Sequence, residues 1–224
     1  MKTINKKYKF TVVASDIVIL SIIENKLQAL LIKMKKAPYF NFWAAPGGLV
    51  KPNESVDSAA KRILKEKAGV KDVYLEQLHT FGDVNRDPFG RVVSVSYYAL
   101  IPNKELKIKT SKEYINATWF AIDDLPQLAY DHKKIIKFAA KKLQQKLAST
   151  NIAYSLLPKE FTLSELQNIY EDILQKKIDK RNFRKKILSL GIVKKTEKKN
   201  IGQAHRPASL YTFTSKKLKN VSIL

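Results

Sequence analysis

The 224-residue sequence contains no cysteine, which excludes disulfide bonds, thiolate catalysis and cysteine-based zinc sites. Its three histidines, His79, His132 and His205, lie far apart along the chain and form no metal-ligand motif. No apolar run approaches the roughly 18 residues that a membrane-spanning helix needs. The basic and then apolar N-terminus lacks a small-residue cleavage site, so we expect a cytoplasmic protein without a membrane partner.

Acidic residues are also scarce, because only 20 Asp and Glu accompany 42 Lys and Arg and leave a formal net charge of +22. Such a charge predicts a polyanionic partner, namely nucleic acid, an anionic surface or a phosphorylated ligand. A lysine-rich proteome would give the same charge without such a partner. The apolar share of 45% is ordinary for a globular protein and sufficient for a packed core.

Residues 1–150 show alternating strand and helix patterns, which predict an α/β domain. A helix is expected after a cap at Asn53 or Ser55, and Gly69 should end it. A helical region is expected to start at residues 123–126, and residues 131–147 are expected to form a lysine-rich amphipathic helix. The strands expected from β-branched and aromatic runs are 10–23, 27–34, 73–81, 91–101 and 117–122.

Residues 151–224 have a different pattern, and the polar stretch 148–155 predicts the domain boundary. Thr162 and Glu165 have the spacing of a capping box, which marks the start of a helix. The order of helix, turn, helix and two-stranded ribbon is typical of a winged helix-turn-helix domain. The expected elements are two helices, 163–174 and 180–190, and two short strands, 192–193 and 210–213.

The most specific spacing in the chain lies in a glycine turn and the helix that follows it. This spacing resembles the Nudix box, and the resemblance implies a Nudix α/β/α sandwich over residues 8 to 148, followed by the winged helix. The matching positions are Gly48, Glu54, Arg62, Leu64, Glu66, Gly69 and Val70.

The box departs from the family pattern at two positions. The pattern has three carboxylates on one helix face, and such oxygen ligands hold Mg²⁺ against a pyrophosphate. Here the three positions are Ile63, Glu66 and Lys67, so one carboxylate remains beside an ammonium. We therefore expect magnesium-dependent hydrolysis to be lost or severely weakened. We also expect the protein to bind no metal ion and no cofactor. Glu66 is expected to pair instead with Arg62, four residues before it, or with the surroundings of Lys67.

Arginine side chains are the main candidates for recognising a ligand, because their forks suit phosphates or vicinal hydroxyls. The loop GDVNRDPFG and the strand after it resemble those of ADP-ribose-type Nudix proteins and of Nudix-related repressors. The alternative is a solvated loop in which Arg86 pairs locally with Asp87. The candidate ligand contacts are Lys33, Gly47, Gly48, Arg86 and Arg91.

The second C-terminal helix has one apolar face, with Phe183, Ile187 and Leu190, and one cationic face. A recognition helix needs this layout, because its side chains reach base edges and phosphates. Residues 151–224 carry 16 Lys and Arg against 6 Asp and Glu, a higher charge density than the rest. The alternative is a solvated basic helix. The candidate DNA contacts are Lys180, Arg181, Asn182, Arg184, Lys185, Lys186 and, in the wing, Arg206.

Both halves of the chain, in this order, resemble the Nudix-related transcriptional regulators. The resemblance implies a homodimeric regulator, and more specifically a repressor, that binds double-stranded operator DNA and senses a small-molecule effector. In that family, members that control NAD metabolism respond to ADP-ribose or a related nucleotide. Relatives of the same architecture control pentose use and respond to a sugar. Two other hypotheses remain: an ADP-ribose pyrophosphatase with a basic tail, and an RNA-binding Nudix relative.

Overall fold

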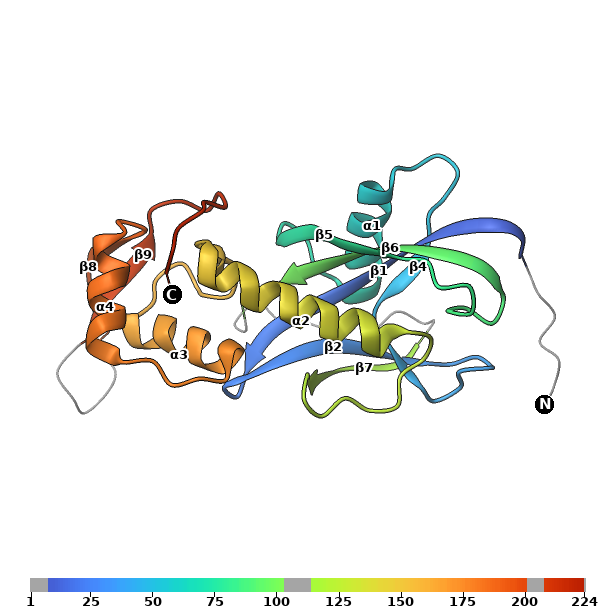
Figure 1. The fold of residues 1–224 in the computed structure, drawn as a ribbon, viewed down its shortest axis with the longest axis horizontal. Helices are drawn as coiled ribbons and strands as arrows, with labels where there is room; N and C mark the ends of the chain where they lie inside the picture. The colour runs from blue at the N-terminus through green and yellow to red at the C-terminus, as the bar shows by residue number, and fades with distance from the viewer. Residues whose placement is uncertain (1–7, 103–113, 201–207, 224) are drawn as a thin grey trace. The chain divides into compact units, whose positions relative to one another are not determined.

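The computed structural model describes residues 8–102, 114–200 and 208–223 (Figure 1). The chain divides into two compact units. The described part of residues 1–20, 28–101 and 106–140 forms the first, which we call the α/β unit. The described part of residues 21–27, 102–105 and 141–224 forms the second, the winged-helix unit. Among the described residues, no helix is both long and apolar enough to cross a membrane.

The strands before residue 122 form one mixed sheet, which has seven strands within the described residues. Its order is β3-β2-β1-β6-β5, while β4 pairs with β1 and β7 pairs with β2. β1 runs parallel to β6 and antiparallel to β4. The strands are β1 (Tyr8–Ile23), β2 (Lys26–Met34), β3 (Trp43–Ala44), β4 (Gly47–Leu49), β5 (Tyr74–Phe81), β6 (Gly90–Leu100) and β7 (Tyr114–Ala121).

Helix α1 (Val56–Ala68) follows the glycine turn and begins where Ser55 accepts a hydrogen bond from the Ser58 amide. Ser55 is therefore the cap, rather than Asn53. Gly69 ends the helix with a left-handed φ of 69°, a conformation that glycine adopts without a steric penalty. The expected start and end of this helix are thus confirmed.

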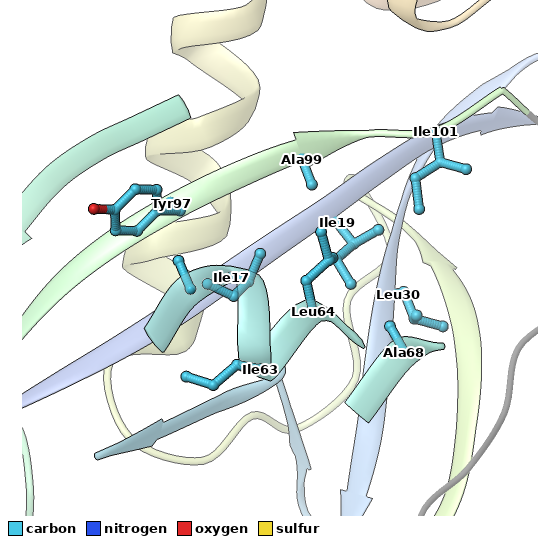
Figure 2. Packing of buried hydrophobic residues seen from close by; sticks show 10 residues of the cluster. Ile17, Ile19, Leu30, Ile63, Leu64, Ala68, Tyr97, Ala99 and Ile101 are labelled. Carbon is cyan, nitrogen blue, oxygen red and sulfur yellow. The ribbon is translucent and has the colours of Figure 1, made fainter. Parts of the chain in front are cut away.

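One face of α1 packs on the sheet and forms the core of the α/β unit (Figure 2). Ile63 and Leu64 are buried there beside Ile17 and Ile19 of β1. Because successive side chains of a strand point to opposite faces, Asp16 points to the other side of the sheet. Helix α2 (His132–Ser149) begins on that side, where His132 lies close to Asp16.

The expected helical start at residues 123–126 is wrong, since this stretch forms a turn and α2 begins only at His132. The segment that follows lies along β3 instead. The Trp43 amide donates to the Gln127 carbonyl at 3.1 Å, and the Ala129 amide donates to the Trp43 carbonyl at 2.8 Å. These bonds take backbone groups that a helix would use, and a proline at position 126 disfavours helical geometry just before it.

The winged-helix unit has two helices followed by a hairpin, as its sequence predicts. The Thr162–Glu165 capping box is present, and Asp179 caps the second helix by accepting from the Asn182 amide. Phe161 adds a short bridge to Tyr211 through two backbone hydrogen bonds. The elements are a 3-10 helix η2 (Ile152–Ser155), α3 (Leu163–Leu174), α4 (Lys180–Ser189), β8 (Val193–Asn200) and β9 (Ala208–Phe213).

Glu171 organises the turn between α3 and α4. Its carboxylate accepts hydrogen bonds from the Gln167 side chain at 2.9 Å, the Ile178 amide at 3.0 Å and Lys177 at 2.9 Å. These three hydrogen bonds lower the pKa of Glu171 from 4.5 to about 2. The bond from Gln167 has the largest effect, followed by those from Ile178 and Lys177. The ionised carboxylate therefore fixes the turn that joins α3 to α4.

We predict that Glu171→Ala lowers the melting temperature of the winged-helix unit by several degrees at pH 7, because the half-buried Ile178 amide loses its acceptor and Gln167 keeps only the Ile178 carbonyl. Lys177→Ala is the matched control and should change little, since Lys177 is 94% exposed. A depressed carboxyl pKa stabilises the fold above pH 4.5, and this contribution disappears as the pH falls toward 2. Circular dichroism melts at pH 7 and pH 3 test both points. Equal melting temperatures for the two variants at pH 7 would show that the Glu171 carboxylate does not stabilise the turn between α3 and α4.

Candidate functional site

A cavity of about 290 Å³ opens in the α/β unit beside β4 and the start of α2. Three candidate ligand contacts, Gly47, Gly48 and Arg86, line it, whereas Lys33 and Arg91 do not. The lining residues that matter for its chemistry are Asp16, Gly47, Gly48, Lys67, Arg86, Asp87, Tyr114 and His132.

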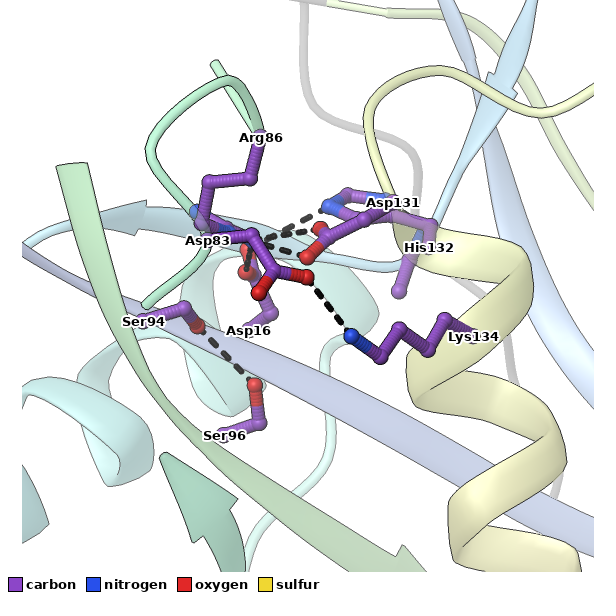
Figure 3. A network of polar contacts seen from close by, with 9 residues as sticks. Asp16, Asp83, Arg86, Ser94, Ser96, Asp131, His132 and Lys134 are labelled. Carbon is purple, nitrogen blue, oxygen red and sulfur yellow. Dashed lines mark hydrogen bonds and ion pairs between the residues drawn. The ribbon is translucent and has the colours of Figure 1, made fainter. Parts of the chain in front are cut away.

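Arg86 is held by a buried network of carboxylates on one side of the cavity (Figure 3). Its Nη2 donates to Asp16 at 3.0 Å and to Asp131 at 2.8 Å, and its Nε donates to Asp131 at 3.1 Å. The side chain is only 3% exposed. The alternative of a solvated local pair with Asp87 is therefore wrong, because the partners come from β1 and from the residue before α2.

His132 completes this network from the first turn of α2. Its Nδ1 accepts a hydrogen bond from the Ala45 amide at 3.0 Å, and its Nε2 lies 3.6 Å from Asp16. Because Nδ1 faces the Ala45 amide, Nε2 is the ring nitrogen that faces the Asp16 carboxylate. Burial alone raises the pKa of Asp16, but contact with His132 and the charge of Arg86 outweigh it and hold that pKa well below its ordinary value.

Gly47 is the point of closest approach between β4 and this network. A Cβ atom at position 47 would lie 2.1 Å from the Asp16 carboxylate and 3.3 Å from the Ser15 carbonyl oxygen. Any side chain would therefore displace Asp16 from His132 and Arg86. At Gly48 the nearest atoms to such a Cβ are Ile63 Cδ1 at 3.7 Å and Lys67 Nζ at 3.9 Å, which are ordinary contact distances.

The retained residues of the Nudix box brace the glycine loop against α1. Arg62 binds both oxygens of Glu54, at 2.5 and 2.9 Å, and donates to the Leu49 carbonyl at 3.1 Å. The bond from Arg62, followed by that from the Lys51 amide, lowers the pKa of Glu54 to about 2. Arg62 also binds Glu66 at 3.3 Å, so the expected i,i+4 pair is confirmed.

The other box positions do not fit a metal ion. Ile63 is fully buried in the core, and Lys67 donates to the Tyr114 hydroxyl and lies 4.9 Å from the centre of that ring. Glu66 is 52% exposed and engaged by Arg62. A divalent cation at this helix face would meet a methyl group and an ammonium where oxygen ligands are required. Within the described residues, no group of three or more His, Asp or Glu could hold a metal.

Two candidate ligand contacts have structural partners outside the cavity. Arg91 donates to the Gly82 carbonyl at 2.6 Å and so closes the base of the loop between β5 and β6. The Lys33 ammonium lies 5.6 Å from the centre of the Trp43 ring. Sequence reasoning missed the cavity residues Asp16 and His132, although a carboxylate inside an apolar strand is itself a signal of a special role.

The candidate DNA contacts on α4 divide into two groups. Phe183 and Ile187 are buried, which turns the opposite face outward. Arg184 differs from the expectation: it is half-buried, donates to Ser164 of α3 at 3.1 Å, and has a buried Nε without a hydrogen bond. Arg206 lies outside the described residues. The exposed candidates are Lys180, Arg181, Asn182, Lys185 and Lys186.

A Nudix-type unit with a cavity, followed by a winged helix with a cationic second helix, is the architecture of a DNA-binding regulator. Residues 14–140 match the NUDIX domain family, and residues 153–213 match the NrtR DNA-binding winged helix domain. The chain therefore belongs to the NrtR family of Nudix-related transcriptional regulators.

Curated proteins of known function are similar to this chain. The ADPR responsive transcriptional repressor NtrR of Acinetobacter baylyi is 36% identical over 212 residues, which are 92% of this chain and 83% of that protein. An ADP-ribose pyrophosphatase of Methanocaldococcus jannaschii is 37% identical over 116 residues, 52% of this chain and 68% of the enzyme. The repressor thus matches both units, whereas the enzyme matches about half of the chain.

Solved structures of Shewanella oneidensis NrtR are also similar to this chain. The protein complexed with a 27mer DNA has a TM-score of 0.80 and 31% identity, covering 90% of this chain and 93% of that chain. Its NUDIX domain complexed with ADP ribose has a TM-score of 0.54 and 30% identity, covering 61% of this chain and 90% of that chain. The expected combination of a Nudix sandwich and a winged helix is confirmed.

We predict that Gly47→Ala destabilises the α/β unit by about 1–3 kcal/mol, because the new methyl group overpacks against the Asp16 carboxylate. Gly82→Ala is the matched control, since its Cβ would meet only Val93, at 3.9 Å. Urea denaturation followed by tryptophan fluorescence measures both variants. A Gly47→Ala protein as stable as Gly82→Ala would show that Asp16 is not fixed in its network.

Proposed function

We propose that this protein is a transcriptional repressor of NAD metabolism that releases its operator DNA when it binds ADP-ribose or a related nucleotide. Residues 1–150 would bind the effector and residues 151–224 would bind the DNA. The observation that carries the proposal is the match of both units, in the same order, to an ADPR responsive repressor over 92% of this chain. We expect a cytoplasmic homodimer, which suits a palindromic operator.

The exposed face of α4 supports the DNA part of the proposal. This face carries five polar or cationic side chains, and α4 contains no acidic residue. Because Phe183 and Ile187 are buried on the opposite face, these five side chains point to solvent. Cations on such a helix neutralise backbone phosphates, and its N-terminal residues reach base edges. Arg184, which binds Ser164, contributes instead to holding α4 against α3.

The cavity supports the effector part. Its wall combines the cations Lys67 and Arg86 with the glycine turn of the box, and this set suits a phosphorylated ligand. A sugar effector is the second candidate, because Asp16, Asp87 and His132 in the same wall are groups that can bind hydroxyls. The retained fold with Ile63 and Lys67 in the box favours binding without hydrolysis.

We predict that the protein binds duplex DNA from upstream of its own gene cluster and that ADP-ribose weakens this complex. Fluorescence anisotropy with labelled duplex should show tight binding that falls steeply with salt, since phosphate contacts release counterions. Adding ADP-ribose, but not a pentose, should raise the apparent Kd. Release by a pentose alone would favour the sugar-responsive alternative, and equal affinity for RNA of the same sequence would favour an RNA-binding role.

Two exposed cations of α4 give a sharper test of the interface. Arg181→Ala combined with Lys185→Ala should weaken operator binding about tenfold or more and reduce the salt slope by about 2, one unit for each phosphate contact. The matched control removes Lys133 and Lys137, which have the same i,i+4 spacing and are exposed on α2. If both double variants lost the same affinity, the effect would reflect net charge rather than α4.

Hydrolysis separates the repressor from a pyrophosphatase. We predict that the protein, incubated with ADP-ribose and Mg²⁺, releases AMP roughly 100-fold or more slowly than a Nudix pyrophosphatase assayed beside it, because two metal ligands are replaced. The measurement is AMP formation by liquid chromatography. Rapid AMP release that EDTA abolishes would overturn the assignment as a regulator without enzymatic activity.

A further inference from the structure

Lys67 occupies the position at which the Nudix box pattern has a carboxylate facing the metal. It lies in the last turn of α1, is half-buried, and lines the cavity together with Gly48. Its Nζ would be 3.9 Å from a Cβ on Gly48, so the ammonium is next to the glycine turn. The helix face that would hold a cation in the family pattern thus carries a cation of its own.

The ammonium of Lys67 is seated on Tyr114 at the start of β7. It donates to the Tyr114 hydroxyl, which fixes the position of the ammonium beside the cavity. Its place near the C-terminal end of α1 also suits a positive charge. Lys65, two residues earlier on the same helix, is exposed and does not line the cavity.

The neighbouring charged groups have other roles. Arg86, the other strong cation in the wall, directs its donors at Asp16 and Asp131. Glu66, the carboxylate that remains in the box, is engaged by Arg62 and does not line the cavity. An anionic ligand that approaches the glycine turn therefore meets Lys67 where the family pattern would present a metal held by carboxylates.

We propose that the Lys67 ammonium, seated on Tyr114, replaces the divalent metal ion in binding the pyrophosphate of the effector. Recognition of the nucleotide is then independent of metal. An ammonium attracts phosphate oxygens through its charge and its N–H donors, as a metal does by coordination. Unlike Mg²⁺, it has no coordination site on which to generate a hydroxide nucleophile, so the bound ligand stays intact. This inference rests on the proposed function, because it requires a phosphorylated effector.

Isothermal titration of the full-length protein with ADP-ribose tests the proposal. The wild type should bind with the same Kd, within about twofold, in buffer with EDTA and in buffer with Mg²⁺. Lys67→Met should weaken ADP-ribose about 10- to 100-fold, the usual effect of losing a charged hydrogen bond. Lys65→Met is the matched control and should bind as the wild type does. Adenosine, which lacks phosphates, should bind Lys67→Met and wild type alike.

The outcomes separate the inference from the function on which it rests. A wild type that loses tenfold or more of its affinity in EDTA would show that a metal is required, and it would overturn the inference alone. Equal ADP-ribose affinity of Lys67→Met and Lys65→Met would do the same. A wild type that binds no ADP-ribose in either buffer would overturn the proposed effector and, with it, the role of Lys67.

A variant that keeps the charge covers the case in which Lys67→Met does not fold. Lys67→Arg preserves a cation beside Tyr114 and should keep metal-independent binding within about tenfold of the wild type. Circular dichroism shows whether each variant is folded. If Lys67→Met is unfolded, the wild-type comparison in EDTA and Mg²⁺ decides the question, and a loss of binding in EDTA still overturns the proposal.

Discussion

The buried guanidinium of Arg86 is the constraint around which the α/β unit is arranged. A buried charge is stable only when its partners are in place, and removing one partner of such a pair typically costs about 3–5 kcal/mol. Asp16 and Asp131 supply these partners from β1 and from the residue before α2, so the network ties a strand, a loop and a helix start together. It also explains why the adjacent turn residue, Gly47, has no side chain.

Local signals in the sequence predict much of this fold, whereas long-range contacts decide the site. The capping box at Thr162 and the glycine that ends α1 depend on residues three or four positions apart, and both are confirmed. The partners of Arg86 are 45 and 70 residues away, so spacing could not identify them. The helical start expected at residues 123–126 failed for the same reason, since backbone bonds to Trp43 compete with it.

The replacement of a carboxylate by Ile63 changes the energetics of α1 as well as its chemistry. Ile63 is fully buried among side chains of β1 and β6, and burying such a side chain contributes about 1.5–3 kcal/mol. A carboxylate at the same position would need a metal or another partner to remain ionised there. The sequence reveals the substitution, but only the structure shows that the helix face has become part of the core. The substitution that we propose removes a metal ligand thus also places an apolar side chain in the core.

A sensor reports the concentration of its ligand only if the ligand leaves unchanged. Its effector must also bind two states of the protein with different affinity, because a ligand cannot shift an equilibrium by more than that difference. Hydrolysis would release two products in place of the effector and remove the interactions that span both phosphates. A cavity that binds a pyrophosphate through an ammonium keeps the electrostatic attraction and omits the metal-bound nucleophile. The residue pair Ile63 and Lys67 thus suits reversible sensing, since one stabilises the fold and the other retains a positive charge at the cavity wall.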